Sequence, residues 1–202
     1  GSSGQVLATN GSGTLSWATA GGASNVNGLS DGLVEDNSMY IGNNPSSTTS
    51  TAQYNLAVGT TALDAITTGD YNVAVGYDVL TDNTTGGHNT ASGYRSLQNN
   101  TTGWGNTASG MQTLSFNTEG IGNVAIGYNS MLGNTQANYN TAIGFHSLYN
   151  TYSNSGANTY NVGLGYKAGD LISTGTNNTI LGADSDPSVN SAENQIVVGY
   201  GV

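Results

Sequence analysis

The stretch YNVAVGYDVLTDNTTG, Tyr71 to Gly86, decides the fold because the chain from about Gly42 onward repeats it. Eight of the nine intervals between its central glycines are 17 residues, and the ninth is 21, which keeps the register across an insertion. A fixed period of this kind predicts a repeat architecture. The repeat glycines are Gly42, Gly59, Gly76, Gly93, Gly110, Gly127, Gly144, Gly165, Gly182 and Gly199.

Each repeat begins with a short phrase such as NVAVG at Asn72, NTASG at Asn106 or NTAIG at Asn140. The alternation of Val, Ile or Thr with Ala predicts a short β-strand. A large apolar residue four positions after the glycine anchors a second short strand or a bend, and a polar corner such as TDNTTG follows. Seventeen residues are too few for a helical repeat, and Gly, Asn and Thr disfavour helix. The sequence therefore predicts an all-β fold, a parallel β-solenoid (β-roll) of about ten 17-residue coils.

Stacking such coils places each residue beside its own copy, about 4.8 Å away. We therefore expect the first residue of the phrase to form an amide ladder that satisfies its own hydrogen bonds. That column is Asn55, Asn72, Asn89, Asn106, Asn123, Asn140, Asn161 and Asn178.

The strand phrase is apolar on one face and very small on the other. In NVAVG, Val73 and Val75 lie on one face, and Ala74 and Gly76 on the other. This pattern indicates close packing on both faces. One coil holds only three or four apolar side chains, which is little core for a single chain. We therefore expect a homo-oligomer, three-fold, with either face as its seam.

Two regions are predicted, residues 1–37 and residues 38–202. The first contains a β-hairpin formed by QVLAT and TLSWA, with Trp17 at its base, and a glycine-rich connector over residues 21–37. The acids of that connector are read as a solvated bend in preference to a calcium site: Asp31, Glu35 and Asp36. The second region is the β-roll, with an insertion at 151–159 where binding is expected and a C-terminus that looks truncated or processed because no cap follows the last strand.

Charge and composition disfavour several partners. The chain has 2 basic and 12 acidic residues, a net charge of −10, so no basic patch exists for nucleic acid or an anionic membrane. There is no cysteine and no apolar run of membrane-spanning length. We expect no nucleic-acid partner, no membrane insertion and no thiol chemistry.

Catalysis, metal binding and cofactor binding find little support. His88 and His146 occupy different places in the repeat, and no serine combines with a histidine and an acid in a recognisable order. GxG patterns such as that at Gly163 are repeat glycines without a following helix. The corner acids are interpreted as solvated turn residues; the alternatives are a carboxylate pair for glycan hydrolysis and a cation site. These acids are Asp64, Asp78 and Asp82 for hydrolysis, and Asp184 and Asp186 for a cation.

Binding through aromatic residues is the better functional hypothesis. Aromatic residues recur directly after the repeat glycine and directly before the repeat Asn. They suit stacking on sugar rings or on a host surface protein, and equally suit locking the coils or a trimer seam together. The candidate binding residues are Tyr77, Tyr94, Tyr128 and Phe145, together with Tyr149 and Tyr152 beside the insertion.

The phrases NTAIGFHSLYNT and NTASGYRSLQNNTTG resemble the repeats of trimeric autotransporter adhesin heads and of phage tail fibres. The NTTG corner and the 17-residue period are more similar to the tail-fibre version, as are GSSGQVLATNGSGTLSW and LSDGLVEDNSMYIGNNPSSTTSTAQYN at the N-terminal end. Together these matches cover nearly the whole chain.

The resemblance implies a left-handed β-roll that trimerises on a virion or cell surface. It favours a non-enzymatic segment of a phage tail fibre, serving as a rigid spacer with a host-receptor (glycan) binding surface. The alternatives are a bacterial trimeric surface adhesin and a glycan-cleaving tailspike. An ice-binding solenoid is disfavoured because the TTG, TEG and TQA corners vary too much for a regular Thr array.

Overall fold

The computed structural model describes residues 5–9, 15–19, 32–42, 45, 48–152 and 155–202. Over these residues the protein is all-β, and none of them belongs to a helix long and apolar enough to cross a membrane. The predicted hairpin is present: β1 (Gln5–Thr9) pairs antiparallel with β2 (Leu15–Thr19). The predicted place of Trp17 at its base concerns a side chain outside the described ones.

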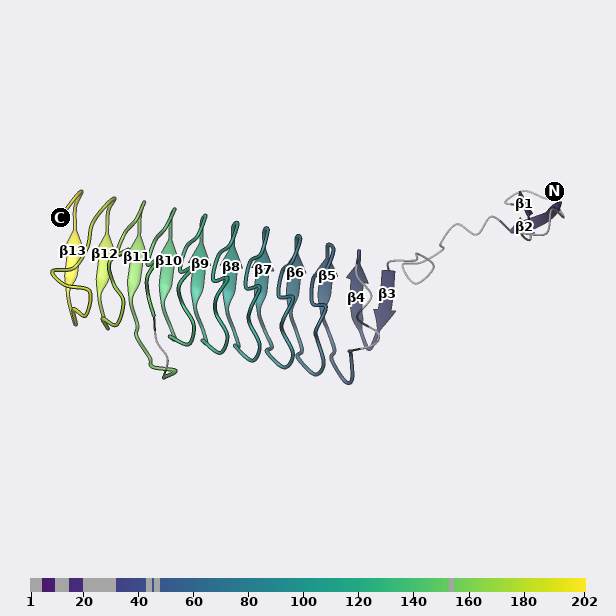
Figure 1. Cartoon of the computed structure of the whole chain (residues 1–202), viewed down its shortest axis with the longest axis horizontal. Coiled ribbons are helices and arrows are strands. Elements are labelled where there is room, and N and C mark those ends of the chain that lie inside the picture. Colours follow the sequence, from purple (N-terminus) through teal and green to yellow (C-terminus); the bar gives the residue numbers. More distant parts are fainter. Residues whose placement is uncertain (1–4, 10–14, 20–31, 43–44, 46–47, 153–154) are drawn as a thin grey trace.

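The main body is an eleven-stranded sheet in which the strands follow one another in sequence order (Figure 1). From β4 to β13 all pairings are parallel, which gives nine turns of a β-solenoid and confirms the predicted fold class. The strands after β4 (Ser38–Ile41) have three residues each: β5 (Leu56–Val58), β6 (Val73–Val75), β7 (Thr90–Ser92), β8 (Thr107–Ser109), β9 (Val124–Ile126), β10 (Thr141–Ile143), β11 (Val162–Leu164), β12 (Thr179–Leu181) and β13 (Ile196–Val198).

The parallel stack begins with a hairpin where the sequence predicts only a connector. Strand β3 (Gly32–Glu35) pairs antiparallel with β4 and forms the first edge of the sheet. The two residues between them, Asp36 and Asn37, have φ of 44° and 61°. Two successive positive φ angles are the geometry of a type I′ turn, which Asp and Asn tolerate.

Each turn contains one strand, so of the two predicted alternatives, a second short strand or a bend, the second strand is absent. The segment after the repeat glycine, such as residues 111–116, is a series of turn residues. Alternate residues in it adopt positive φ, for example Gln112 at 54° and Leu114 at 51°. The backbone still bonds to the next turn, as in Leu114 N to Ser130 O at 3.1 Å, but its dihedral angles are not those of β-structure.

The Ala face of the strands forms the interior. Ala57, Ala74, Ala91, Ala108, Ala125 and Ala142 are at most 1 % exposed. They share the core with the large apolar residues that follow each glycine, all of which are fully buried: Leu63, Leu80, Leu97, Leu114, Met131 and Leu148. The small face identified in the sequence is therefore the inside of each solenoid.

In the last turns a larger strand residue compensates for a smaller residue in the column of large apolar side chains. Ile180 replaces the strand alanine and is fully buried. The next two positions of the column of large apolar residues are occupied by Gly169 and Asp186, which lie 21 and 38 residues after Leu148. A Cβ on Gly169 would lie 2.7 Å from Leu148 Cδ2 and 3.4 Å from Ile180 Cγ1. The larger strand residue thus fills space that leucine fills in the earlier turns.

Candidate functional site

The predicted amide ladder is confirmed along the interior. Asn72 N donates to Asn55 Oδ1 at 2.8 Å, and Asn72 Nδ2 donates to the same oxygen at 3.1 Å and to Gly86 O at 2.9 Å. The same bonds recur as far as Asn178, except at the insertion, where Asn140 Nδ2 donates to Asn138 O and the Thr159 hydroxyl donates to Asn140 Oδ1. Because every nitrogen and oxygen of these buried amides has a partner, the column is structural and is not a ligand site.

A second, shorter amide ladder was not predicted. Asn100 Nδ2 donates to Asn83 Oδ1, Asn117 to Asn100 and Asn134 to Asn117, at 2.6 to 2.8 Å. It ends at Asn134 because Thr151 stands at the next position. The Oδ1 atom of Asn134 and the Oγ1 atom of Thr151 are buried and find no partner among the described residues. The NN and FN pairs in the corners were the sequence signal for this ladder.

The corner threonines form a third ladder that also stops nearby. In Thr67, Thr84, Thr101 and Thr118 the hydroxyl donates to the backbone oxygen of the threonine one turn on, at 2.9 to 3.2 Å. The next members of the column after Thr135 are Tyr152, Ser173 and Asn190. The regular corner therefore changes chemistry at the insertion.

The predicted binding aromatics are distributed over three places. Tyr77 and Tyr94 stack on each other with ring centroids 5.7 Å apart. Tyr128, Phe145 and Tyr149 all stack on His146, at 5.8, 4.2 and 4.6 Å. Tyr152 lies apart from them, and no described ring stacks on it, although its side chain is 45 % exposed.

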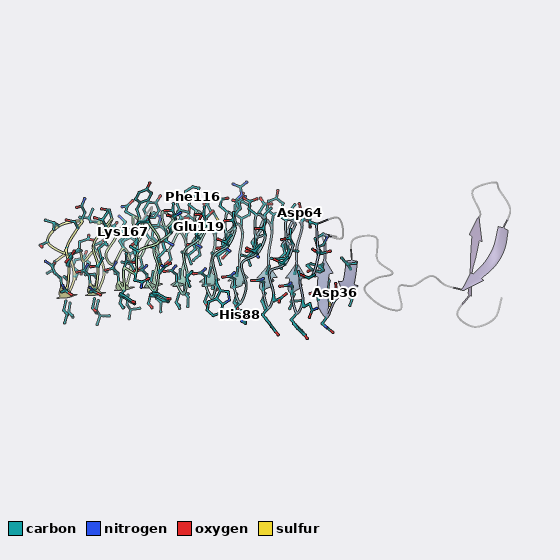
Figure 2. The ribbon with its side chains drawn as sticks, turned by 90° about the horizontal axis from the view of Figure 1, so that it is seen from below. Asp36, Asp64, His88, Phe116, Glu119 and Lys167 are labelled. Atoms are coloured by element: carbon teal, nitrogen blue, oxygen red, sulfur yellow. The ribbon has the colours of Figure 1, made fainter. Side chains whose placement is uncertain are left out.

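Stacking covers most of the ring faces in these columns and leaves the ring edges exposed. Tyr128 and Phe145 are 5.2 Å apart and Phe145 and Tyr166 are 5.3 Å apart, so both faces of Phe145 and one face each of Tyr128 and Tyr166 are covered within the column. A second column, Tyr54, Tyr71 and His88, has spacings of 4.8 Å, and His88 then contacts Trp104 at 5.0 Å. Figure 2 places His88 on the side of the solenoid where the strands lie. Such columns add cohesion between turns.

Each of the two described basic side chains packs onto an aromatic ring that directly follows a repeat glycine. The guanidinium carbon of Arg95 lies 5.0 Å from the centroid of Tyr94, and Lys167 Nζ lies 5.5 Å from that of Tyr166. Burial among the rings, with the charge of Lys167 as a smaller cause, lowers the pKa of His146. The neutral imidazole is thereby favoured within its stack.

The corner acids are engaged locally. Asp78 accepts from the Thr61 hydroxyl and from Arg95 Nε at 3.4 Å. The structure records no contact that joins Asp78 to Asp64 or Asp82. Asp186 accepts from Leu171 N at 2.9 Å. Burial and the nearby Asp170 and Asp184 raise the pKa of Asp186, against the opposing effect of the Leu171 bond.

Metal ligands are not gathered anywhere in the described part of the chain. No group of three His, Asp or Glu residues there could hold a metal ion. Asp31, one of the acids weighed for calcium, lies outside the described residues. Its companion Asp36 forms the β3–β4 turn.

The outer face of the sheet carries an exposed apolar stripe. It consists of the first and third residues of the strands, and we call it the outer stripe. Its centre is polar, at Thr90, Ser92, Thr107 and Ser109. Eight of its apolar members are between 36 % and 80 % exposed: Val58, Val75, Ile126, Val162, Leu164, Leu181, Ile196 and Val198. Others are half-buried: Leu56, Val73, Val124 and Ile143.

One groove lies on the surface near the insertion. It has a volume of about 660 Å³ and is lined by Gly133, Asn150, Tyr152, Leu171, Ser173 and Asn190. Of these residues only Tyr152 was a sequence-predicted binding residue. The others could be found only through the 17-residue register, which places Asn150 after Gly133 and Asn190 after Ser173.

Comparison of the chain with protein-family models, with curated proteins and with solved structures finds no match in any of the three. The fold and the surfaces described above therefore carry the functional argument.

Proposed function

We propose that the chain is a rigid, trimeric segment of a surface fibre of the phage tail-fibre type, with a non-enzymatic role in holding or presenting a receptor-binding surface. The observation that carries the proposal is the outer stripe. Its two apolar ends, on either side of the polar centre at β7 and β8, are exposed apolar surface of the kind that marks a protein–protein contact.

The occupant we propose for the outer stripe is a second and third copy of the same chain. The stripe repeats with the turn spacing, so a parallel copy would present matching residues along its whole length. It contains no charged side chain, so pairing would bury no unpaired charge. The interior of one solenoid is narrow, with alanine as its usual strand residue, and pairing would add buried apolar surface to it.

Rigidity supports the role of a spacer. Backbone bonds join all nine turns, the first amide ladder runs from Asn55 to Asn178, and the second amide ladder and the corner threonine ladder reinforce the turns before the insertion. Each turn contacts mainly its neighbours, so the body is an extended rod and not a globule (Figure 1).

Light scattering on the purified chain tests the proposal. We expect three times 20.4 kDa. Ile126→Asp, which puts a charge on the outer stripe, should lower the mass to that of one chain, whereas Thr102→Asp on an exposed corner should leave the trimer intact. A monomer with a full β spectrum for the unchanged protein would contradict the proposal.

The choice between a phage fibre and a bacterial surface adhesin depends on the encoding gene. Neighbouring virion genes would support the phage fibre. A membrane-anchor barrel and a coiled-coil stalk in the same open reading frame would support the adhesin. Release of fragments from a host polysaccharide, lost in Asp78→Asn, would instead support the tailspike.

A further inference from the structure

The groove near the insertion forms where three regular features of the solenoid end together. The second amide ladder stops at Asn134, next to Gly133. The corner threonine column gives way to Tyr152, Ser173 and Asn190. The turn between Gly144 and Gly165 has 21 residues in place of 17. The groove is therefore a local departure from a surface that otherwise repeats.

Gly133 opens one end of the groove. The equivalent positions in the two preceding turns hold Asn99 and Phe116, and Phe116 is 50 % exposed. At Gly133 that side chain is missing, and a Cβ there would approach Tyr149 O to 2.9 Å. A bare backbone beside Asn150 leaves room that the side chains of Asn99 and Phe116 occupy in the two preceding turns.

The groove combines apolar surface with uncharged polar groups. The rings and methyls come from Tyr152 and from Leu171, which is 57 % exposed. The polar groups are the amides of Asn150 and Asn190 and the hydroxyl of Ser173. Asn150 Nδ2 is held by Asp170 O at 2.6 Å, which fixes the orientation of that amide.

These groups are arranged on a firm backbone. Tyr152 N donates to Ser173 O at 2.8 Å, and Ser173 N donates to Asn190 O at 2.9 Å. Leu171 N is held by the Asp186 carboxylate. Three neighbouring turns thus present their side chains in one hydrogen-bonded register, and little ordering would be needed on binding.

From this chemistry we infer that the groove binds a neutral saccharide. A pyranose ring has an apolar face that stacks on an open aromatic face, and hydroxyl groups that pair with amides and hydroxyls. Among the six predicted binding residues, Tyr152 is the one on which no other described ring stacks. No basic side chain lines the groove, and Asp170 and Asp186 lie beside it, so anionic sugars are disfavoured.

The groove stays accessible in the trimer proposed above. Figure 2 shows Phe116 on the side of the solenoid away from the strands, and Gly133 occupies the same position one turn later. A seam on the outer stripe would leave that side open. The inference rests on the receptor-binding part of the proposed function and deepens it. It does not depend on whether the protein is a trimer.

Saturation-transfer NMR on the full chain tests the inference, with oligosaccharides of glucose, galactose, mannose and N-acetylglucosamine as probes and sialyllactose as the anionic comparison. We expect transfer to at least one neutral probe and weaker transfer to sialyllactose. Tyr152→Ala should weaken binding at least about tenfold, because an aromatic anchor carries much of the affinity in such a site. Asn190→Ala should weaken it less.

Tyr71→Ala is the matched control, because Tyr71 is similarly exposed but stacked between Tyr54 and His88. It should leave binding unchanged. Absence of transfer to all four neutral probes, stronger transfer to sialyllactose, or equal loss in Tyr71→Ala and Tyr152→Ala would overturn the inference. A trimer by light scattering with no saccharide binding would overturn the groove alone and leave the fibre proposal standing.

Discussion

Individual side chains hold the turns of this solenoid together mainly through hydrogen bonds. The buried asparagines have no apolar contribution to make, yet they occupy the most regular column of the molecule. Each one satisfies backbone groups that a 17-residue turn cannot pair by strand ladders alone, since only three residues per turn are in strands. Removal of one of these side chains should therefore lower stability by the cost of leaving its buried hydrogen-bond partners unsatisfied.

Asn106→Ala is expected to destabilise the protein by about 2–4 kcal/mol, because it leaves Asn123 N without its partner and removes one donor each from Gly120 O and Asn89 Oδ1. Chemical denaturation at one protein concentration measures the change. Thr102→Ala, in the same turn and exposed, should change stability by less than about 0.5 kcal/mol. Equal effects of the two substitutions would contradict the structural role of the ladder.

Substitution of two glycines in one turn by alanine distinguishes the cost of a steric clash from the cost of a left-handed backbone. Gly110 has φ of 135°, and a Cβ there would lie 2.7 Å from Gly127 O, whereas Gly105 has φ of 68° with nothing within 4 Å. Gly105→Ala should cost about 1–2 kcal/mol, the strain of the left-handed region. Gly110→Ala should cost more than about 3 kcal/mol or prevent folding, because backbone must move as well. Thermal melts of both variants provide the comparison.

Asp186 should make stability depend on pH in the direction opposite to an ordinary paired carboxylate. Its pKa is raised by burial and by Asp170 and Asp184, so the folded state binds more protons than the unfolded state between the unfolded pKa of 3.8 and the higher folded value. Stability should therefore fall as the pH rises through that window. Asp186→Asn should flatten this part of the profile, and an unchanged profile would show that Asp186 titrates normally.

The turn segment after each glycine is the element that sequence patterns describe least well. Leucine and methionine there are fully buried while their φ angles are near 50°, as in Leu80, Leu97 and Leu114. Left-handed backbone costs L-residues about 1–2 kcal/mol, whereas burying a leucine contributes about 1.5–3 kcal/mol. Burial therefore holds these residues in a conformation that their propensity disfavours.

At Leu97, replacement by glycine should cost no more stability than replacement by alanine, in contrast to the usual order. Leu97→Ala removes buried methyl groups and is expected to cost about 2–5 kcal/mol. Leu97→Gly makes a larger cavity but relieves the positive φ of 50°, so it should cost no more than Leu97→Ala, although glycine usually costs about 0.5–1 kcal/mol extra. Denaturant titration of both variants decides, and a clearly less stable Leu97→Gly would argue against strain at this position.

The whole molecule behaves as a stack of interchangeable turns. Strands β5 to β13 pair position for position, and the 21-residue turn is accommodated between β10 and β11 without loss of register. Longer turns are tolerated because extra residues leave the stack as a loop. Shorter turns cannot close around the interior.

Deletion of residues 90–106 should therefore be tolerated better than deletion of residues 101–104. The first removes one complete turn and joins Asn89 to Thr107, which restores the phrase NTASG. It should keep a β spectrum and cooperative melting, with a melting temperature within about 5 °C. The second leaves only 13 residues between Gly93 and Gly110 and should abolish cooperative melting. Circular dichroism compares the two, and equal damage would contradict a modular stack.

The sequence by itself determined the architecture, because a strict 17-residue period with Gly and Asn at fixed places allows one way of stacking. The β-solenoid, the ladder of Asn55 to Asn178 and the N-terminal hairpin all follow from short-range patterns. Only the tertiary structure decided that the Ala face is interior, that the turn after each glycine is left-handed and that most aromatic faces are covered. These depend on how one turn lies against the next, as does the groove, whose residues span Gly133 to Asn190. The pattern within one turn does not contain that information.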